Sequence, residues 1–552
     1  MAIKEENVHI QRENQPSYGG VDSGITDENE VKDSVDLLEA TIGGFGRWQC
    51  QLSILVSILK IPISWIQLSI VFLAPPTEFW CAPPKKFEGL STRKWIDLIS
   101  SGSNVTGKLH ICEMPNVLDS RNTSIVPCQW GYEYNTTQVH SSIITEWDLV
   151  CDRKILADIT QTILMFGILV GLTIFGPAAD RYGRRKTLLL STFLLVVFGI
   201  LSTLSPFYSM FMVLRFILAV VSSGVMVTSF VVCVEIVAGS WRTTVPILHQ
   251  IPFGLGNAIM AVMAYYIREW RHLQLILCGI SALYLCYYWL VPESPRWLMA
   301  VGRKEEAIVI LENAAKMNGI DKALIRKKVN ELNFIDDECI DNKISLMTVF
   351  KTSELKRRSI YLCLKWFFNG VVFYGFYQYA GQLNDNMYLT IGIIGLISIP
   401  GGIIGAIIVK KLGRKVSIAA ANYLTAACIF SIIFIPQGVY YQDWPIILLA
   451  AGGIFGLTIS SPALHLFTGE LYPTIMRNAA LGLNIMLTKL GAMIAPLLIG
   501  LSSISPIIPM ASFAALSLVE AILVHPLPET LDTMLPETVR DIEDDTTSLI
   551  SH

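Results

Sequence analysis

Twelve apolar runs constrain the fold of this chain more than any other feature of its sequence. Of its 552 residues, 52% are hydrophobic and only 16% are charged, which is too apolar for an ordinary soluble protein. Each run is near the ~20 residues that a helix needs to cross the hydrocarbon core of a bilayer. We therefore predict an all-α membrane protein with twelve spans, at about 52–74, 158–178, 188–205, 210–233, 245–266, 272–291, 359–381, 387–409, 416–436, 445–467, 478–501 and 503–524.

A short polar link, Gly176–Lys186, joins the second and third runs. It is too short to cross a bilayer, so both runs must reach water on the same side. Its four cations place that side in the cytoplasm, where short loops collect Lys and Arg. A plain positive-inside loop accounts for these charges equally well.

The link has a second copy in the other half of the chain. Lys410–Lys415 has the same small, basic design, and its Gly413 follows Gly183 by 230 residues. A Glu followed seven residues later by an Arg repeats at an offset of 235: Glu235 with Arg242, and Glu470 with Arg477. Duplicated halves around a site near the membrane midplane are typical of secondary transporters.

The polar segments divide the chain around these two halves. Residues 1–41 carry no basic region followed by a cleavable apolar core, so we expect a cytoplasmic tail and no signal peptide. The net charge of −3 suggests no nucleic-acid partner. We expect both termini in the cytoplasm, with a six-helix bundle at 42–291, a cytoplasmic linker at 292–357, a second bundle at 358–524 and a tail at 525–552.

The segment 75–157 is expected to be a large extracellular loop. It holds four clustered cysteines, which predict two disulfides of undecided pairing: Cys81, Cys112, Cys128 and Cys151. It also holds three glycosylation sequons, at Asn104, Asn122 and Asn135. The two outward-facing cations Arg268 and Arg271 are exceptions to an otherwise consistent orientation.

Several motifs together resemble a known family. Gly176–Lys186 resembles the signature loop of the major facilitator superfamily. Pro292–Leu298, Glu470–Thr474 with Arg477, and the cysteine-rich first loop are similar to the organic anion, cation and zwitterion transporters, solute carrier family 22. The resemblance covers about 43–537. It implies a major facilitator fold, in which two six-helix bundles close alternately over a central site.

Six charged residues at the cytoplasmic ends of the spans are candidates for gating. They could form ion pairs between the bundles that break and reform: Asp180, Arg184, Glu235, Arg242, Glu470 and Arg477. The alternative is that these charges only cap helix ends.

Charges inside the spans are the best guide to the substrate, because each is costly there. The candidates facing the centre are Lys60, Lys365, Lys489, His249 and His465. The resemblance places an acid of the cation carriers at Lys489, where anion and carnitine carriers have Arg, and another at Ser398. The Lys of classical anion carriers, however, aligns with Gly402. Alternatives are a structural ion pair for Lys489 and, for Lys60 and Lys365, side chains that extend to the interface.

Aromatic and polar neighbours complete the expected binding site. The seventh span contributes Phe373, Tyr374 and Tyr377, and the first span Trp65 and Gln67. Aromatic faces can hold a cationic or flat organic group. Packing is the alternative for most of them, and we favour it for Tyr379.

These observations lead to one functional expectation and two alternatives. We expect a plasma-membrane carrier of small organic anions or zwitterions that bear a carboxylate. Its expected partners are the organic substrate, the surrounding lipid bilayer and a coupling ion or counter-substrate. An organic cation carrier is the alternative within transport, and a non-transporting receptor is the alternative of another class. The sequence has no complete phosphate-binding loop, metal-spaced His/Cys set or catalytic triad, so we expect no enzyme, cofactor or metal.

Overall fold

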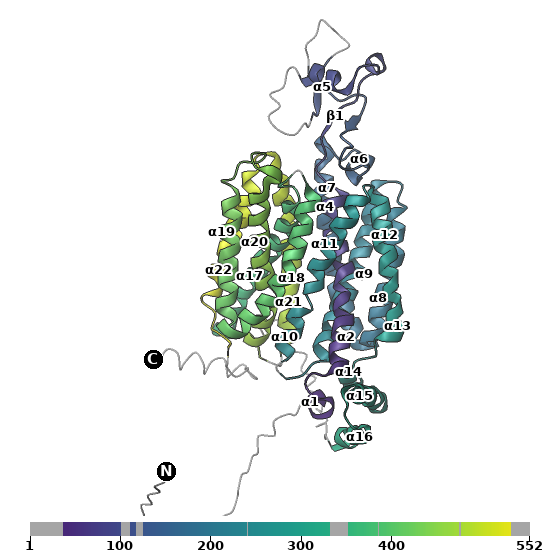
Figure 1. Ribbon diagram of the computed structural model, residues 1–552, viewed down its shortest axis with the longest axis vertical. Helices are drawn as coiled ribbons and strands as arrows, with labels where there is room; N and C mark the ends of the chain where they lie inside the picture. Colours follow the sequence, from purple (N-terminus) through teal and green to yellow (C-terminus); the bar gives the residue numbers. More distant parts are fainter. Residues whose placement is uncertain are drawn as a thin grey trace, which may run out of the picture.

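The computed structural model describes residues 37–100, 111–116, 125–239, 241–331, 352–384, 386–473 and 476–531. Within these residues, twelve helices are long and apolar enough to cross a membrane, as the apolar runs predicted. They form two six-helix bundles that stand side by side (Figure 1). Several helices extend beyond the apolar runs, among them Lys154–Tyr182 and Ser353–Ala380, because polar residues continue the helical backbone.

The first bundle contains three spans that are interrupted and three that are continuous. The first span is α2 (Arg47–Ile58), α3 (Lys60–Leu68) and α4 (Ile70–Leu73); the fifth is α10 (Trp241–Leu248) and α11 (Ile251–Tyr266); the sixth is α12 (Trp270–Ala282), a 3₁₀ turn (Leu283–Cys286) and α13 (Tyr287–Leu290). A proline at the start of α11 contributes to its break, because proline has no N–H for the helical ladder. The continuous spans are α7 (Lys154–Tyr182), α8 (Arg184–Thr203) and α9 (Tyr208–Glu235).

The second bundle contains six spans, each built mainly from one continuous helix. These are α17 (Ser353–Ala380), α18 (Met387–Leu412), α19 (Arg414–Ile432), α20 (Trp444–Leu471), α21 (Arg477–Gly500) and α22 (Ile507–Val524), with 3₁₀ turns at Tyr441–Asp443 and Leu501–Ser503. The two bundles meet where α11 packs along α18 and where α7 packs along α21. The boundary between the bundles therefore pairs the fifth span with the eighth and the second span with the eleventh.

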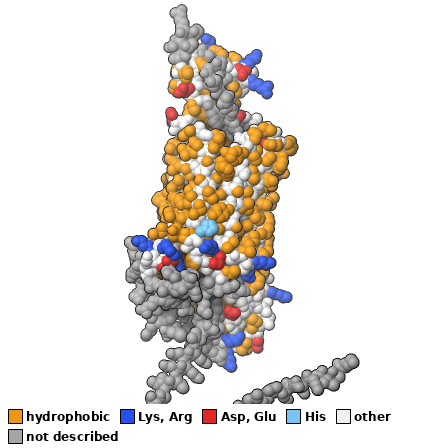
Figure 2. All heavy atoms as spheres, turned by 90° about the vertical axis from the view of Figure 1, so that its left-hand side faces the viewer, with side chains coloured by type: hydrophobic (Ala, Val, Ile, Leu, Met, Phe, Trp, Pro, Cys, Tyr) orange, Lys and Arg blue, Asp and Glu red, His pale blue; other side chains and the backbone are white. Residues whose placement is uncertain are grey.

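A belt of apolar side chains covers the outside of the bundles. Figure 2 shows it as a hydrophobic band with charged side chains above and below. Large side chains in this band are exposed, among them Phe193, Phe430 and Leu448. Such a surface suits contact with lipid tails rather than water.

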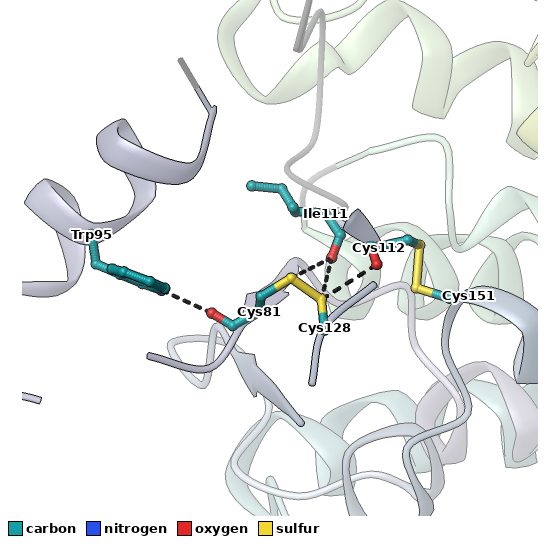
Figure 3. Close-up of a disulfide and its surroundings, with 6 residues drawn as sticks. All are labelled: Cys81, Trp95, Ile111, Cys112, Cys128 and Cys151. Atoms are coloured by element: carbon teal, nitrogen blue, oxygen red, sulfur yellow. Dashed lines mark hydrogen bonds between the residues drawn. A yellow bond between two sulfur atoms is a disulfide. The ribbon is translucent and has the colours of Figure 1, made fainter. Parts of the chain in front are cut away.

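A small disulfide-bonded unit stands at one end of the bundles. It contains α5 (Thr92–Ser100), α6 (Ile143–Trp147), 3₁₀ turns at Lys85–Phe87 and Cys151–Arg153, and two antiparallel strand pairs: β1 (Phe79–Cys81) with β4 (Tyr132–Tyr134), and β2 (Glu113–Pro115) with β3 (Ile125–Pro127). The predicted disulfides are present, and their pairing is Cys81–Cys128 and Cys112–Cys151 (Figure 3). The indole of Trp95 donates to the carbonyl oxygen of Cys81 at 2.8 Å, which closes the small core.

This loop unit is attached mainly to the first bundle. Glu146 accepts a hydrogen bond from the indole of Trp270 at 2.7 Å and pairs with Arg271. Arg268 also contacts this unit, because it donates to the carbonyl oxygen of Thr137. Both cations that depart from the expected charge orientation therefore bind groups of the loop unit. The second bundle reaches the unit through the hydroxyl of Tyr388, which donates to the carbonyl oxygen of Gln138 at 3.0 Å.

Four short helices lie at the opposite end (Figure 1). They are α1 (Leu37–Ile42), α14 (Pro295–Ala300), α15 (Lys304–Asn318) and α16 (Lys322–Glu331). The structure differs here from the expected N-terminal tail, because 37–41 are helical and pack on α15 and α16. The apolar side chains of Leu38 and Ile42 are buried in that contact. Residues 1–36, most of the C-terminal tail, and the sequons at Asn104 and Asn122 lie outside the described residues.

Candidate functional site

Lys489 on α21 and Tyr374 on α17 meet because these two helices pack backbone to backbone. A Cβ atom on Gly370 would lie 2.0 Å from the carbonyl oxygen of Thr488, and one on Gly491 would lie 2.0 Å from that of Phe367. Only glycine permits so close an approach. The Lys489 ammonium lies 4.4 Å from the centre of the Tyr374 ring and donates to its hydroxyl.

This contact continues into the first bundle. The Tyr374 hydroxyl donates to Oε1 of Gln67 on α3 at 2.8 Å. The amide of Gln161 on α7 donates to the backbone oxygen of Gln67 at 2.9 Å. Lys489, Tyr374 and Gln67, which the sequence placed in one site, therefore form a hydrogen-bonded chain across the two bundles.

Lys60, His249 and His465 surround the same region. Lys60 on α3 is 5% exposed, and Lys489 on α21 is 4% exposed. Both imidazoles lie within electrostatic reach of Lys60. Among the described residues, no carboxylate forms an ion pair with Lys60 or Lys489. Each bundle therefore contributes one Lys and one His to this region.

The predicted aromatic residues divide into two groups. Phe373 lies 5.2 Å from the Tyr374 ring and 5.1 Å from the Tyr377 ring, centre to centre, so these three form one cluster. The Tyr377 hydroxyl is hydrogen-bonded to Ser398 at 2.7 Å. Trp65 instead donates to the carbonyl oxygen of Gly256 at 2.8 Å and ties α3 to α11. Tyr379 donates to the carbonyl oxygen of Pro506, consistent with a packing role.

Lys365 is held in an ion pair that the sequence analysis did not identify. Its ammonium pairs with Glu520 on α22, and neither side chain is exposed. Asn369 also lies within hydrogen-bond reach of Glu520 at 3.5 Å, and it contacts Ser461 on α20. The charge of Lys365 is therefore compensated inside the second bundle. A single Glu in the last apolar run was the available signal for this partner.

The signature loop forms a network around Arg184. Its guanidinium pairs with Asp180 at 2.9 Å and with Glu235 at 2.8 Å. Glu293 accepts hydrogen bonds from the backbone N–H groups of Arg184 and Arg185, at 2.8 and 3.1 Å, at the start of α8. A carboxylate is favoured at a helix N-terminus, so Glu293 caps α8.

The second half repeats this network. Arg414 pairs with Glu470 at 2.9 Å, and Glu529 accepts from the backbone N–H groups of Arg414 and Lys415 at 2.8 and 3.0 Å. The sequence analysis missed the roles of Glu293 and Glu529. The signal was the recurrence of Pro-Glu followed by a hydroxyl residue, at 292–294 and 528–530.

The ion pairs of Arg184 and Arg414 lie within a bundle, and the expected pairs between bundles remain a prediction. Asp180, Arg184 and Glu235 all belong to the first bundle, and Glu470 pairs with Arg414 rather than with Arg477. Arg477 of the second bundle lies near Arg242 of the first, across the seam where the two bundles meet. Burial lowers the pKa of Arg477; Glu470 opposes this effect and Arg242 adds to it. The seam therefore brings two cations together in this state.

Comparisons with known proteins agree with this architecture. Residues 154–496 match the sequence model of the Major Facilitator Superfamily. The chain is 32% identical to rat solute carrier family 22 member 3, over 91% of this chain and 94% of that protein. It is 30% identical to the organic cation transporter protein of Drosophila melanogaster and to human solute carrier family 22 member 13, each over 91% of this chain and over 93% and 92% of those proteins.

Solved structures show the same fold at low sequence identity. The proton:xylose symporter XylE, bound to 6-bromo-6-deoxy-D-glucose, has a TM-score of 0.62 at 16% identity, over 90% of this chain and 98% of that one. The inward-open conformation of XylE from E. coli has a TM-score of 0.59, over 90% and 99%.

Proposed function

Because this chain belongs to the Major Facilitator Superfamily and, within it, to solute carrier family 22, we propose that it carries small organic anions or zwitterions that bear a carboxylate. Transport would follow an alternating-access mechanism. It would be either secondary active, driven by the gradient of a coupling ion or counter-substrate, or facilitative, down the gradient of the substrate itself. The observation that carries this proposal is the buried, unpaired ammonium of Lys489 at the junction of the bundles. A buried charge without a partner is costly, and a carboxylate would compensate it.

The aromatic cluster supports an anionic group on the substrate more than a cationic one. A cation would need a free aromatic face or an acid. The Lys489 ammonium already occupies a position over the Tyr374 ring. Glu520, a fully buried acid of the second bundle, is paired with Lys365.

The second candidate is an organic cation carrier, which the name of the Drosophila relative favours. Both candidates use the same rocking motion. In this motion the hydrogen bond between Tyr374 and Gln67 would break and reform, because its two residues belong to different bundles.

We place the disulfide-bonded unit outside the cell and the four short helices in the cytoplasm. Disulfides persist in oxidising compartments, which supports the plasma membrane as the location. The basic residues of both signature loops lie at the other end of the bundles, as the positive-inside rule requires. Both termini would then be cytoplasmic.

Radiolabelled uptake of a carboxylate, a zwitterion and tetraethylammonium, with and without sodium, tests this function. We expect wild-type cells to accumulate the carboxylate or the zwitterion. Lys489→Ala should lose most of that uptake, whereas Lys489→Arg should keep part of it, because only the latter retains the cation. Lys316→Ala, an exposed Lys on α15, is the matched control.

All rates are compared at equal surface abundance, since an altered intramembrane charge can impair folding. Uptake of tetraethylammonium alone, with carboxylate uptake absent, would reject the anion assignment and leave the cation carrier. No uptake of any compound at normal surface abundance would support a receptor.

A further inference from the structure

We propose that the disulfide-bonded loop unit takes part in the transport cycle, and that Tyr388 is the residue through which it does so. Tyr388 is the second residue of α18 (Met387–Leu412) in the second bundle. It acts as a positioning residue that holds the two bundles together at their outer end, which is the end that carries the loop unit. The inference rests on the rocking motion proposed above but not on the identity of the substrate.

The Tyr388 side chain contacts three parts of the molecule. Its ring stacks on the ring of Phe72 in α4, with centres 5.8 Å apart and planes inclined by 8°. The ring of Tyr265 in α11 meets it edge-on, with centres 5.8 Å apart and planes inclined by 82°. The Tyr388 hydroxyl donates to the carbonyl oxygen of Gln138 in the loop unit at 3.0 Å. One side chain of the second bundle therefore binds the first span, the fifth span and the loop unit.

The loop unit forms part of the seam at this end. Val139 of the loop unit lines the same small hollow as Phe72 and Tyr388. The Val139 side chain is buried, and it belongs to one apolar cluster with Phe72 and with Ile391 of α18. The unit is therefore a wall of the seam, in contact with both bundles.

The anchor of the loop unit makes the Tyr388 hydrogen bond a contact between bundles. Glu146 accepts a hydrogen bond from the indole of Trp270 at 2.7 Å and pairs with Arg271, so the unit is tied to the first bundle. All three partners of Tyr388 thus lie on the first bundle or on the unit attached to it. Separation of the outer ends must break all three contacts. Tyr388 therefore stabilises the state in which the outer ends touch, relative to the state in which they are apart.

Two engineered cysteines can measure the balance between these states without any substrate. An added Cβ on Gly392, one turn beyond Tyr388, would lie 3.8 Å from Cβ of Ala261 in α11. Disulfides have a Cβ separation of about 3.8 Å. The pair Ala261→Cys with Gly392→Cys should therefore cross-link only while the outer ends touch.

The single variant Ala261→Cys reports the opposite state. Ala261 is 2% exposed, so a maleimide should reach a cysteine there only while the ends are apart. Mass spectrometry of the purified protein gives both rates, and the protein without engineered cysteines gives the background from its native free cysteines. The ratio of the cross-linking rate to the labelling rate follows the equilibrium between the two states.

Substitutions of Tyr388 should lower this ratio by different amounts. Tyr388→Ala should lower it about tenfold, because two ring contacts and a hydrogen bond are lost. Tyr388→Phe keeps the rings and loses only the hydroxyl, so we expect a decrease of about threefold. Tyr441→Ala is the matched control and should leave the ratio unchanged, because the Tyr441 side chain is 84% exposed.

Loosening the anchor tests the role of the loop unit itself. Glu146→Gln removes the charge that pairs with Arg271, and it should lower the ratio about twofold. The same change in Tyr388→Phe should have no further effect, because the hydroxyl no longer connects the unit to the second bundle. Equal effects of Glu146→Gln with and without the hydroxyl would overturn the role of the loop unit.

The remaining outcomes separate this inference from the proposed function. If Tyr388→Ala and Tyr388→Phe have the same ratio as Tyr441→Ala, the inference is wrong. If Tyr388→Ala does not fold, Tyr388→Phe decides the question. Uptake into vesicles should stop when the cysteine pair is cross-linked and should return on reduction. Normal uptake by the cross-linked protein would refute the rocking motion, whereas a reversible block with unchanged ratios would refute only the role of Tyr388.

Discussion

Lys365 and Glu520 show how a charge inside a span can serve the fold rather than the substrate. Both side chains are fully buried, and they pair across α17 and α22. We expect Lys365→Met to reduce folded protein at the surface sharply, because removing one partner of a buried pair costs about 3–5 kcal/mol. The double variant Lys365→Met with Glu520→Leu should recover much of the loss, because it leaves no unpaired charge.

Surface biotinylation and the melting temperature of the purified variants measure this effect. Uptake per surface molecule separates it from substrate binding. If the Lys365→Met variant folds well but no longer binds carboxylates, the result would instead indicate that Lys365 contacts the substrate.

At the scale of single residues, the sequence singled out Lys489 because an intramembrane charge is conspicuous. Lys489, Tyr374 and Gln67 were all named from their positions in the spans, and they form one hydrogen-bonded chain. The partner of Lys365 could not be named in this way. It lies 155 residues away, and its contact depends on the rotation of α17 and α22 about their own axes.

Among the elements, the turn into α8 depends on Gly183. Its φ is +101°, and an added Cβ would lie 2.5 Å from Oε2 of Glu293, the carboxylate that caps α8. We expect Gly183→Ala to lower maximal uptake severalfold with a smaller change in KM, because the turn lies far from the central site. Gly302→Ala is the control for a positive φ, since its φ is +76° and nothing lies within 4 Å of the added Cβ.

A comparable loss of maximal uptake in Gly183→Ala and Gly302→Ala would show that backbone strain alone causes the effect. A loss that appears mainly as a raised KM would contradict the gating role. Gly413→Ala, at φ +90° and 2.6 Å from Glu529, tests the same turn in the second half.

The loop unit is the element whose sequons remain to be tested. Asn135 accepts hydrogen bonds from both the backbone and the hydroxyl of Thr137, the third residue of its sequon. We expect deglycosylation to shift the electrophoretic mobility of the wild type. The triple variant Asn104→Gln, Asn122→Gln, Asn135→Gln should lack that shift, and an unchanged shift would argue against extracellular placement.

For the whole molecule, the sequence predicted the twelve spans and the duplication, because length, apolarity and spacing are all local properties of the chain. It did not predict which charges pair, because the choice between pairs within a bundle and pairs between bundles depends on how the helices are packed. The capping acids Glu293 and Glu529 are equivalent in space, although the sequence around them is only weakly repeated.

The seam between α11 and α18 should control how far the bundles close. A Cβ on Gly395 would lie 2.6 Å from the backbone nitrogen of Ala258, so Gly395→Val forces the bundles apart. We expect maximal uptake to fall about tenfold, since overpacking costs about 1–3 kcal/mol. Gly279→Val on α12 is the control, because nothing lies within 4 Å of that site. Equal losses in both variants would show a general effect of valine in a span.

With the loop unit placed outside the cell, as proposed above, its attachment has a practical consequence for inhibiting this carrier. The unit is fixed to one bundle through Glu146 and touches the other through the hydrogen bond from Tyr388 to Gln138. An antibody that recognises these two surfaces together would bind only while they are in contact. It would hold the carrier in that one conformation without entering the membrane or competing with the substrate.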